Sequence, residues 1–359
     1  MGKEWSMRAY REGDEDGIFE LFKAVYPERQ YDHHEWLSWW HWMYKDNPAG
    51  PGLIWLAEHN NRIVGHYAIV PTRLAITGKT VLACQGTDAL THPNYRRQKI
   101  FESLASRVYT EAAQDSMYIV YGFPNPFSYP IHIEKLDWFY IANMQLMLKP
   151  LNWKDTIVLM AKNKCLGTIL SPLAALLCNK AFLKRNKTNA TEGLTINKVA
   201  SFDRRFDMLW ARVANQFQIM VERKSDYLNW RYGVPEMNYS IFIAEKHSEI
   251  WGYLVSKHVA VGGIKVSIVF DMVAQSEDVL NCLITKAINY CQQSGVALIQ
   301  YQLIANKVYQ RLLKRNGFIA LPFLKGSHFC ARSSSTDISK QFLANPDNWF
   351  VQIGDSDLI

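Results

Sequence analysis

Apolar runs in the first third of the chain predict a sheet. The segment GLIWLAEHNNRIVGHYAIV (52–70) contains two apolar strands around the turn HNNR, and KTVLACQGTDAL (79–90) reads as a third strand. From Ile100 apolar residues recur with the spacing of one helical face, and SMYIVYG (116–122) beyond that helix is typical of a buried strand. A helix between two strands indicates a β-α-β crossover.

The same pattern returns in the second half of the chain. Residues 54–65 (IWLAEHNNRIVG) align with residues 241–252 (IFIAEKHSEIWG), an offset of 187 residues. Further aligned pairs follow with small shifts, and these are Asp88 and Asp271, Ile100 and Val279, and Asn125 and Asn306. A repeated order of elements indicates an internal duplication. We therefore expect two copies of one fold.

The length of the chain also favours two domains, because 359 residues exceed the size at which one hydrophobic core usually stops growing. We expect an N-terminal domain over 1–150, a helical connector and polar linker over 151–194, and a C-terminal domain over 195–359. The connector contains CLGTILSPLAALLCN, which is uncharged but too short to span a bilayer. Residues 165–183 predict either a helix packed across both domains or an interfacial helix in weak contact with an anionic membrane surface.

The composition is that of an ordinary globular protein, with 48% hydrophobic and 20% charged residues. The net charge of +7 suits an anionic ligand, but no basic stripe with interleaved aromatic residues indicates nucleic-acid binding. Six cysteines without a CxxC pair favour a reducing compartment, and the polar start MGKEWSMRAYREGDED differs from a signal peptide. We expect a cytoplasmic protein, with its oligomeric state left open.

The loop HPNYRRQKIF (92–101) concentrates cations between a strand and a helix. At a helix N-terminus the backbone N–H groups lack partners and the helix dipole is positive, so such a place suits phosphate. Arg96, Arg97 and Lys99 add charge-assisted hydrogen bonds, and the combination suits a pyrophosphate. The alternative is a solvated basic loop.

This strand, loop and helix resemble the coenzyme A site of the GNAT superfamily of N-acyltransferases, whose loop has the pattern [QR]-x-x-G-x-[GA]. TDALT (87–91) resembles the family's splayed strand, whose backbone polarises the thioester carbonyl, and Arg96 takes the leading loop position. NKVYQRLLKRNGF (306–318) is similar to the family's N-x-x-A-x-x-x-Y-x-x-x-G-F ending. The resemblance implies a mixed α/β (α+β) fold of two acyl-CoA N-acyltransferase-like domains, each a twisted mixed sheet flanked by helices.

The resemblance also implies acetyl-coenzyme A as co-substrate, without a metal. By this resemblance, the co-substrate contacts the splayed strand, the cationic loop and one asparagine beyond the next strand. These residues are Leu90, Thr91, His92, Arg96, Arg97, Gln98, Lys99, Ile100, Phe101 and Asn125.

The chain departs from the family pattern at two places. Lys99 and Phe101 stand where the family has small residues that let the backbone approach phosphate. The tyrosine that acts as general acid in many members is replaced by Ile133 in the first copy and by Leu313 in the second. Tyr129, one turn earlier on the same predicted helix, is the nearest substitute.

The two copies differ in their loops. MVAQSED (272–278) of the second copy carries two acids and no base, so we expect a degenerate cofactor loop there and co-substrate binding in the first domain. Asp88 on the splayed strand is a candidate general base that takes the proton of the acceptor amine through water. The alternative is a structural carboxylate that caps the backbone or pairs with an arginine.

Two further segments carry polar chemistry. The segment YDHHEWLSWWHWMY (31–44) contains His33, His34 and His41, but the adjacent pair His33 and His34 has no third ligand at metal spacing, so we expect no zinc site. We expect this segment to form an aromatic helix that is mostly core. NPDNWFVQIGDSDLI (345–359) predicts either a frayed tail or a segment that holds a cationic acceptor through Asp355 or Asp357.

These observations predict a tandem N-acetyltransferase that moves an acetyl group from acetyl-coenzyme A to an amine of a small molecule or amino sugar. The missing loop glycines and the missing tyrosine favour an alternative, a catalytically degenerate coenzyme A-binding or scaffold protein.

Overall fold

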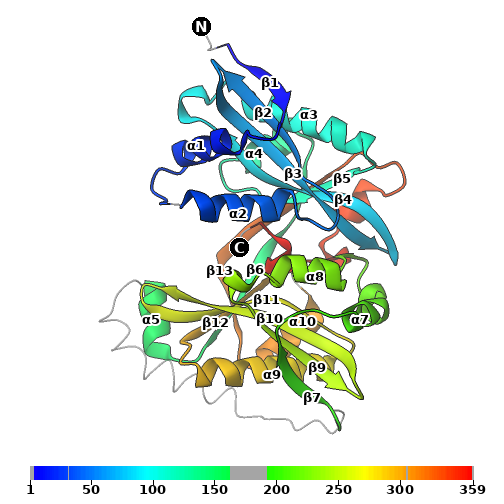
Figure 1. Ribbon diagram of the computed structural model, residues 1–359. Coiled ribbons are helices and arrows are strands. Elements are labelled where there is room, and N and C mark those ends of the chain that lie inside the picture. Colours follow the sequence, from blue (N-terminus) through cyan, green and yellow to red (C-terminus); the bar gives the residue numbers. More distant parts are fainter. Residues whose placement is uncertain (1–3, 31, 162–191, 305, 358–359) are drawn as a thin grey trace. The chain divides into compact units, whose positions relative to one another are not determined.

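The computed structural model describes residues 4–30, 32–161, 192–304 and 306–357. The chain divides into two compact units (Figure 1). The first unit consists of the residues up to 142 together with residues 327–348, and the second consists of residues 143–326 together with the residues from 349 onward. Each unit combines a sheet with helices, which confirms the predicted mixed α/β class.

The sheet of the first unit has the strand order β1-β2-β3-β4-β5-β13. Its strands are β1 (Ser6–Ala9), β2 (Leu53–His59), β3 (Arg62–Ile76), β4 (Lys79–Thr91), β5 (Ile119–Gly122) and β13 (Ile319–Ser333). Neighbouring strands are antiparallel except β4 and β5, which run parallel. The helix α3 (Ile100–Gln114) connects these two parallel strands, so the predicted hairpin and crossover are confirmed.

Helices cover both faces of this sheet. They are α1 (Glu15–Val25), α2 (His33–Tyr44), α3 and the short α4 (Tyr129–Lys135). A Cβ added to Gly65 of β3 would meet Ile100 of α3, whereas the ring of the next residue, His66, lies 6.2 Å from the ring of Tyr44 of α2. Because successive side chains of a strand point to opposite faces, α2 and α3 cover opposite faces of the sheet.

The second unit repeats this order of elements, with the strand order β6-β12-β11-β10-β9-β7. Its strands are β6 (Phe139–Pro150), β7 (Thr195–Val199), β9 (Ser240–Lys246), β10 (Glu249–Val261), β11 (Ile264–Ala274) and β12 (Leu298–Leu303). Its helices include α7 (Arg205–Val213), α8 (Ser225–Tyr232), α9 (Glu277–Gln293) and α10 (Lys307–Arg315). As in the first unit, one helix, α9, joins two parallel strands, β11 and β12.

The last strand of each sheet comes from the other half of the chain. In the first unit Cys330–Ser333 of β13 pair with β5. In the second unit Gln145–Pro150 of β6 pair with β12. The units therefore differ from the contiguous domains 1–150 and 195–359 expected from the sequence, because pairing between strands far apart in the chain leaves no local pattern to read.

The connector lies largely outside the described residues. Its first part is the helix α5 (Trp153–Ala161), whereas the prediction for residues 165–183 falls outside the described residues. Among the helices that the structure describes, none has the length and apolarity needed to cross a membrane.

Candidate active site

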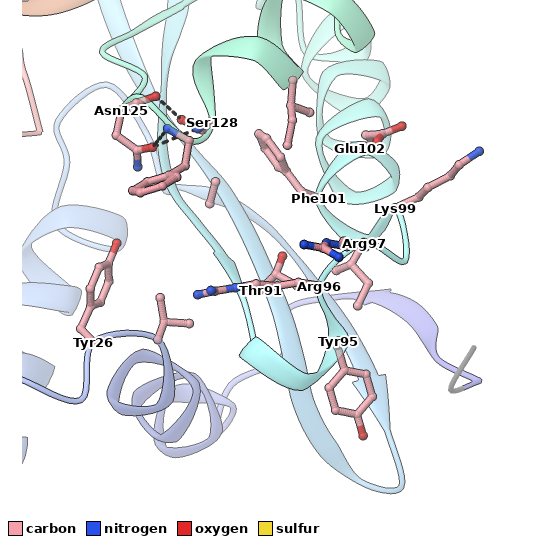
Figure 2. Close-up of a pocket in the computed structure, with 15 residues that line it drawn as sticks. Tyr26, Thr91, Tyr95, Arg96, Arg97, Lys99, Phe101, Glu102, Asn125 and Ser128 are labelled. Carbon is pink, nitrogen blue, oxygen red and sulfur yellow. Dashed lines mark hydrogen bonds between the residues drawn. The ribbon is translucent and has the colours of Figure 1, made fainter. Parts of the chain in front are cut away.

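A cavity of about 540 Å³ lies in the first unit beside the ends of β4 and β5 (Figure 2). Three segments line this β4–β5 pocket: the end of α1, the stretch from β4 to the first turn of α3, and the loop that leads into α4. The lining residues are Val25, Tyr26, Ala89, Thr91, Tyr95, Arg96, Arg97, Lys99, Ile100, Phe101, Glu102, Asn125, Phe127, Ser128 and Ile131.

The β4–β5 pocket forms where β4 and β5 separate. Their parallel pairing covers Cys84–Gln85 against Val120–Tyr121. Beyond that point β4 stays paired with β3, and the His92 N–H donates to the Val64 carbonyl at 2.9 Å. Because successive residues of a strand direct their N–H groups to opposite edges, the Thr91 N–H points to the edge of β4 that β5 has left. The strand is splayed as the sequence predicted, and a backbone donor faces the pocket.

A β-bulge interrupts β4 just before this donor. Thr87 pairs with Ala68 and Leu90 pairs with His66, so Asp88 and the following residue lie opposite a single residue of β3. Asp88 takes a left-handed backbone conformation with φ +43°. Bulges redirect a strand and often stand beside active sites.

The helix α3 begins at the pocket without a side-chain cap. Its first turn contains Ile100, Phe101 and Glu102, whose N–H groups have no acceptor within the helix. The first helical bond runs from the Ser103 N–H to the Lys99 carbonyl, at 2.9 Å. Lys99 itself adopts φ +60°. It therefore keeps the left-handed conformation that glycine would supply, at a cost of about 1 to 2 kcal/mol.

Arg96 and Arg97 supply the positive charge of the β4–β5 pocket. Neither guanidinium pairs with a carboxylate among the residues that the structure describes. In Figure 2 the side chains of Lys99 and Glu102 point away from both guanidinium groups. Two cations and an uncapped helix N-terminus thus face the same space, an arrangement that suits a pyrophosphate.

Asn125 follows β5 and fixes the other wall of the pocket. Its Oδ1 accepts from the N–H groups of Phe127 and Ser128, both at 2.9 Å. Its main-chain carbonyl accepts from the Tyr129 N–H at 2.9 Å, which starts α4. The Nδ2 of Asn125 forms no hydrogen bond with the described part of the chain, so it can donate to a ligand.

Most of the predicted co-substrate residues line the pocket. They are Thr91, Arg96, Arg97, Lys99, Ile100, Phe101 and Asn125. The other three predicted residues do not line the pocket. Leu90 is 2% exposed and points into the core, and Gln98 lies outside the lining. The side chain of His92 instead caps the turn η1 (Pro93–Tyr95) by accepting from the Asn94 N–H.

Sequence reasoning missed several lining residues. Ala89 could have been found, because it lies two residues before Thr91 and shares its face of the strand. Tyr26 at the end of α1 had no signal in the sequence, because only the tertiary fold brings that helix to the pocket.

Asp88, the predicted general base, lies next to the pocket but does not line it. Its Oδ2 accepts from the Tyr44 hydroxyl at 2.5 Å, and that hydroxyl is 3.0 Å from the Thr87 hydroxyl. Its Oδ1 has no hydrogen-bond partner among the described residues. The partner of this carboxylate is therefore a buried tyrosine of α2, and one oxygen stays available to accept a proton.

Tyr129, the predicted general acid, begins α4 but does not line the pocket. Its ring stacks on His328 with centroids 4.4 Å apart, and burial raises the pKa of its hydroxyl. Ile133, at the position of the family's tyrosine, packs against the apolar core of the unit. The role of Tyr129 stays a prediction.

Two buried histidines predict acid sensitivity. Burial lowers the pKa of His132 to about 4 and also lowers that of His66, so both are neutral when folded. An unfolded histidine binds a proton below about pH 6.5. The free energy of unfolding should therefore fall by up to about 1.4 kcal/mol per pH unit on account of His132 as the pH drops from 6.5 toward 4, and His66 adds to this fall below pH 6.5. Urea unfolding at several pH values measures this slope, and an equal slope in His132→Gln contradicts the assignment.

The corresponding cleft of the second unit is filled by the end of the chain. β11 and β12 pair over Val266–Val269. Beyond this pairing, Oε1 of Gln352 accepts from the Met272 N–H at 2.9 Å, and the Val351 carbonyl accepts from the Ile304 N–H at 2.9 Å. The chain's own backbone and a side-chain amide thus occupy the space between the two strands.

Asp355 corrects the prediction for the tail. It is 2% exposed, and its Oδ1 lies 2.6 Å from Nη2 of Arg223, whose Nε lies 2.9 Å from Oδ2 of Asp271. Burial raises the pKa of Asp355, and Arg223 opposes that shift. The described tail is not frayed, and the cation that Asp355 holds is Arg223 instead of an acceptor. The position of the tail is fixed by its packing within the second unit, and the polar sequence of the tail does not reveal such tertiary contacts.

The loop of the second unit is unsuited to phosphate. Ser276 caps α9 by accepting from the Val279 N–H, and Glu277 and Asp278 stand in the first turn. A phosphate there would meet acids where the first unit offers arginines.

The aromatic helix α2 belongs largely to the core of the first unit. Trp36, Trp40, Trp42 and Met43 of α2 are buried, which confirms the expected core role. In the part of the chain that the structure describes, His, Cys, Asp and Glu side chains form no cluster suited to a metal ion.

Comparison with known families agrees with this geometry. Residues 6–140 match the family model described as an acetyltransferase (GNAT) domain. The matched residues lie within the first unit. No curated protein matches the chain.

Solved structures resemble the fold over most of the chain. A GCN5-related N-acetyltransferase from Anabaena variabilis is 10% identical, with TM-score 0.65, over 92% of this chain and 73% of its own. A conserved protein of unknown function from Enterococcus faecalis is also 10% identical, with TM-score 0.66 and the same coverage. Eis1 from Mycobacterium abscessus is 11% identical, with TM-score 0.60, over 95% of this chain and 76% of its own. At these identities the likeness shows the fold.

Proposed function

We propose that the protein is an N-acyltransferase that moves an acetyl group from acetyl-coenzyme A to an amine of a small molecule or amino sugar. One observation carries the proposal: in a GNAT acetyltransferase domain, the β4–β5 pocket combines an uncapped helix N-terminus, Arg96 and Arg97 with a splayed strand edge. The pyrophosphate binds the first turn of α3 and both guanidinium groups. The pantetheine arm extends back along β4.

Two backbone N–H groups on β4 receive the arm. The Thr91 N–H is nearer the phosphate loop and binds an amide carbonyl of pantetheine. The Ala89 N–H lies farther along and binds the thioester oxygen. The amine nitrogen then attacks the thioester carbon, and Asp88 takes the amine proton through water. The charge that develops on the thioester oxygen is stabilised by the Ala89 N–H. The C–S bond breaks, and the released thiolate of coenzyme A takes a proton from Tyr129 or from solvent.

The second unit supports the first and binds no acyl-coenzyme A in this proposal. Its cleft holds Gln352, and its loop carries Glu277 and Asp278. We propose on the same grounds that the chain is a tandem of two GNAT-like units with one working site.

A catalytically degenerate coenzyme A-binding or scaffold protein is the second candidate. The observation that favours it is the position of Tyr129 and Ile133, neither of which lines the pocket. Such a protein would bind coenzyme A without turnover. Thiol release from acetyl-coenzyme A in the presence of glucosamine, spermidine or tyramine distinguishes the two candidates.

Asp88→Asn tests the base with an acceptor that turns over. We expect kcat to fall about 100-fold or more, because an amide cannot accept the amine proton. Coenzyme A affinity, measured by calorimetry, should change little. Asp271→Asn is the matched control in the second unit and should lower stability while kcat is retained. An unchanged kcat in Asp88→Asn removes Asp88 from the mechanism and leaves the binding site intact.

A further inference from the structure

The bulge of β4 is held by side chains that the proposed mechanism does not use. The left-handed conformation of Asp88 costs about 1 to 2 kcal/mol for a residue other than glycine. A peptide in such a conformation persists only where its surroundings fix it. At Asp88 the main-chain carbonyl and the carboxylate each have a buried partner from another element.

His66 of β3 holds the main-chain carbonyl. Its Nδ1 lies 2.8 Å from the Asp88 carbonyl oxygen, and the residue is 2% exposed. Burial lowers the pKa of His66, so the ring carries one proton at neutral pH. A carbonyl oxygen can only accept, so that proton is on Nδ1. The Nε2 is buried and has no hydrogen-bond partner among the described residues.

The peptide group makes this contact relevant to the pocket. The Asp88 carbonyl and the Ala89 N–H belong to one planar peptide and point in opposite directions. Holding the carbonyl on the His66 ring, which lies on the α2 side of β3, therefore keeps the Ala89 N–H turned away from that ring. Ala89 lies two residues before Thr91, so its N–H points, like that of Thr91, to the edge of β4 that β5 has left. Ala89 lines the pocket at that edge.

Tyr44 of α2 secures the same residue from its side chain. Its hydroxyl donates to Oδ2 of Asp88 at 2.5 Å, and Tyr44 is 1% exposed. The carbonyl and the carboxylate of Asp88 are thus held separately, so the Asp88–Ala89 peptide cannot turn without breaking a buried hydrogen bond. Leaving that carbonyl unpaired would cost about 1 to 3 kcal/mol.

The second unit offers an internal comparison. Met272 follows Asp271 as Ala89 follows Asp88, and the Met272 N–H donates to the side-chain carbonyl of Gln352 at 2.9 Å. At the corresponding place in the repeat, this backbone donor therefore already binds an amide carbonyl oxygen.

We propose that His66 is a positioning residue of the acyl-transfer site, which orients the Asp88–Ala89 peptide so that the Ala89 N–H polarises the thioester carbonyl. The inference rests on the proposed function, because the thioester is that of acetyl-coenzyme A. His66 does not touch the co-substrate. It acts through one backbone peptide.

Isotope-edited infrared spectroscopy of acetyl-coenzyme A labelled with ¹³C at the carbonyl tests this without an acceptor. Binding to the full chain should shift the thioester carbonyl stretch to lower wavenumber. His66→Leu should lose at least half of that shift, because leucine has no donor. His66→Asn should keep most of it, because its Nδ2 occupies the place of Nδ1. Affinity for acetyl-coenzyme A should be similar in all three proteins.

A full shift in folded His66→Leu, or an equal loss in both variants, would overturn the proposal. Nitrogen NMR of histidine-labelled wild-type protein tests it even where the leucine variant does not fold. The Nδ1-protonated form of His66 is expected, and protonation on Nε2 alone overturns the proposal. If acetyl-coenzyme A did not bind to the wild-type protein, the proposed function would be refuted instead. The NMR measurement would still report which nitrogen of His66 carries the proton, because it does not depend on acetyl-coenzyme A.

Discussion

Replacing Arg96 and Arg97 together by alanine should abolish the stabilisation of the protein by coenzyme A. Both guanidinium groups face the β4–β5 pocket without a carboxylate partner among the described residues, so they are available to the pyrophosphate. A hydrogen bond to a charged group contributes about 1.5 to 3 kcal/mol, so losing two should weaken coenzyme A binding by about 100-fold or more. The rise in melting temperature with coenzyme A should disappear with the affinity.

Lys99→Ala is the matched control for this variant. It removes one cation of the same loop, but the side chain points away from the two guanidinium groups. Its effect on coenzyme A affinity should be much smaller. The melting temperature without ligand should change little in the double variant, because both arginine side chains are exposed. A double variant that still responds fully to coenzyme A would show that the phosphate site lies elsewhere.

Arg223→Met should destabilise the second unit by about 3 to 5 kcal/mol, because it leaves two buried carboxylates without their cation. Arg223 is 2% exposed, and its guanidinium bridges Asp271 and Asp355. Asp271 also accepts from the Tyr253 hydroxyl at 2.9 Å and from Nε2 of Gln352 at 2.5 Å. Loss of the arginine should thus weaken the contacts that hold the C-terminal segment in the cleft.

Urea unfolding measures this effect. Arg205→Met makes the same substitution at an arginine that also pairs with two carboxylates, Asp203 and Glu245, but in contact with solvent, and it should cost less than about 1 kcal/mol. If Arg223→Met were no more destabilising than Arg205→Met, the buried network would not be what holds the tail.

The sequence predicts those features that depend on local pattern. The alternation of 52–70 predicts the hairpin of β2 and β3, and the helical spacing from Ile100 predicts α3 from its first residue. The placement of Arg96 and Arg97 at the pocket follows from the strand, loop and helix order. Each of these depends on neighbours along the chain.

Features that depend on tertiary contacts could not be predicted. The carbonyl that His66 holds is exposed by a register shift in β4, which alternation does not reveal. Gln352 reaches Met272 across eighty residues of sequence, and nothing near Gln352 marks that partner. The contact of Asp88 with Tyr44 joins a strand to a helix that composition alone assigns to the core.

A crystal structure of the full chain with coenzyme A tests the central claim most directly. We predict one coenzyme A per chain, with its pyrophosphate at Arg96, Arg97 and the first turn of α3 and its pantetheine arm beside Ala89 and Thr91. Gln352 should remain in the cleft of the second unit. Coenzyme A bound between β11 and β12, or bound in the first unit away from the two arginines, would contradict the account.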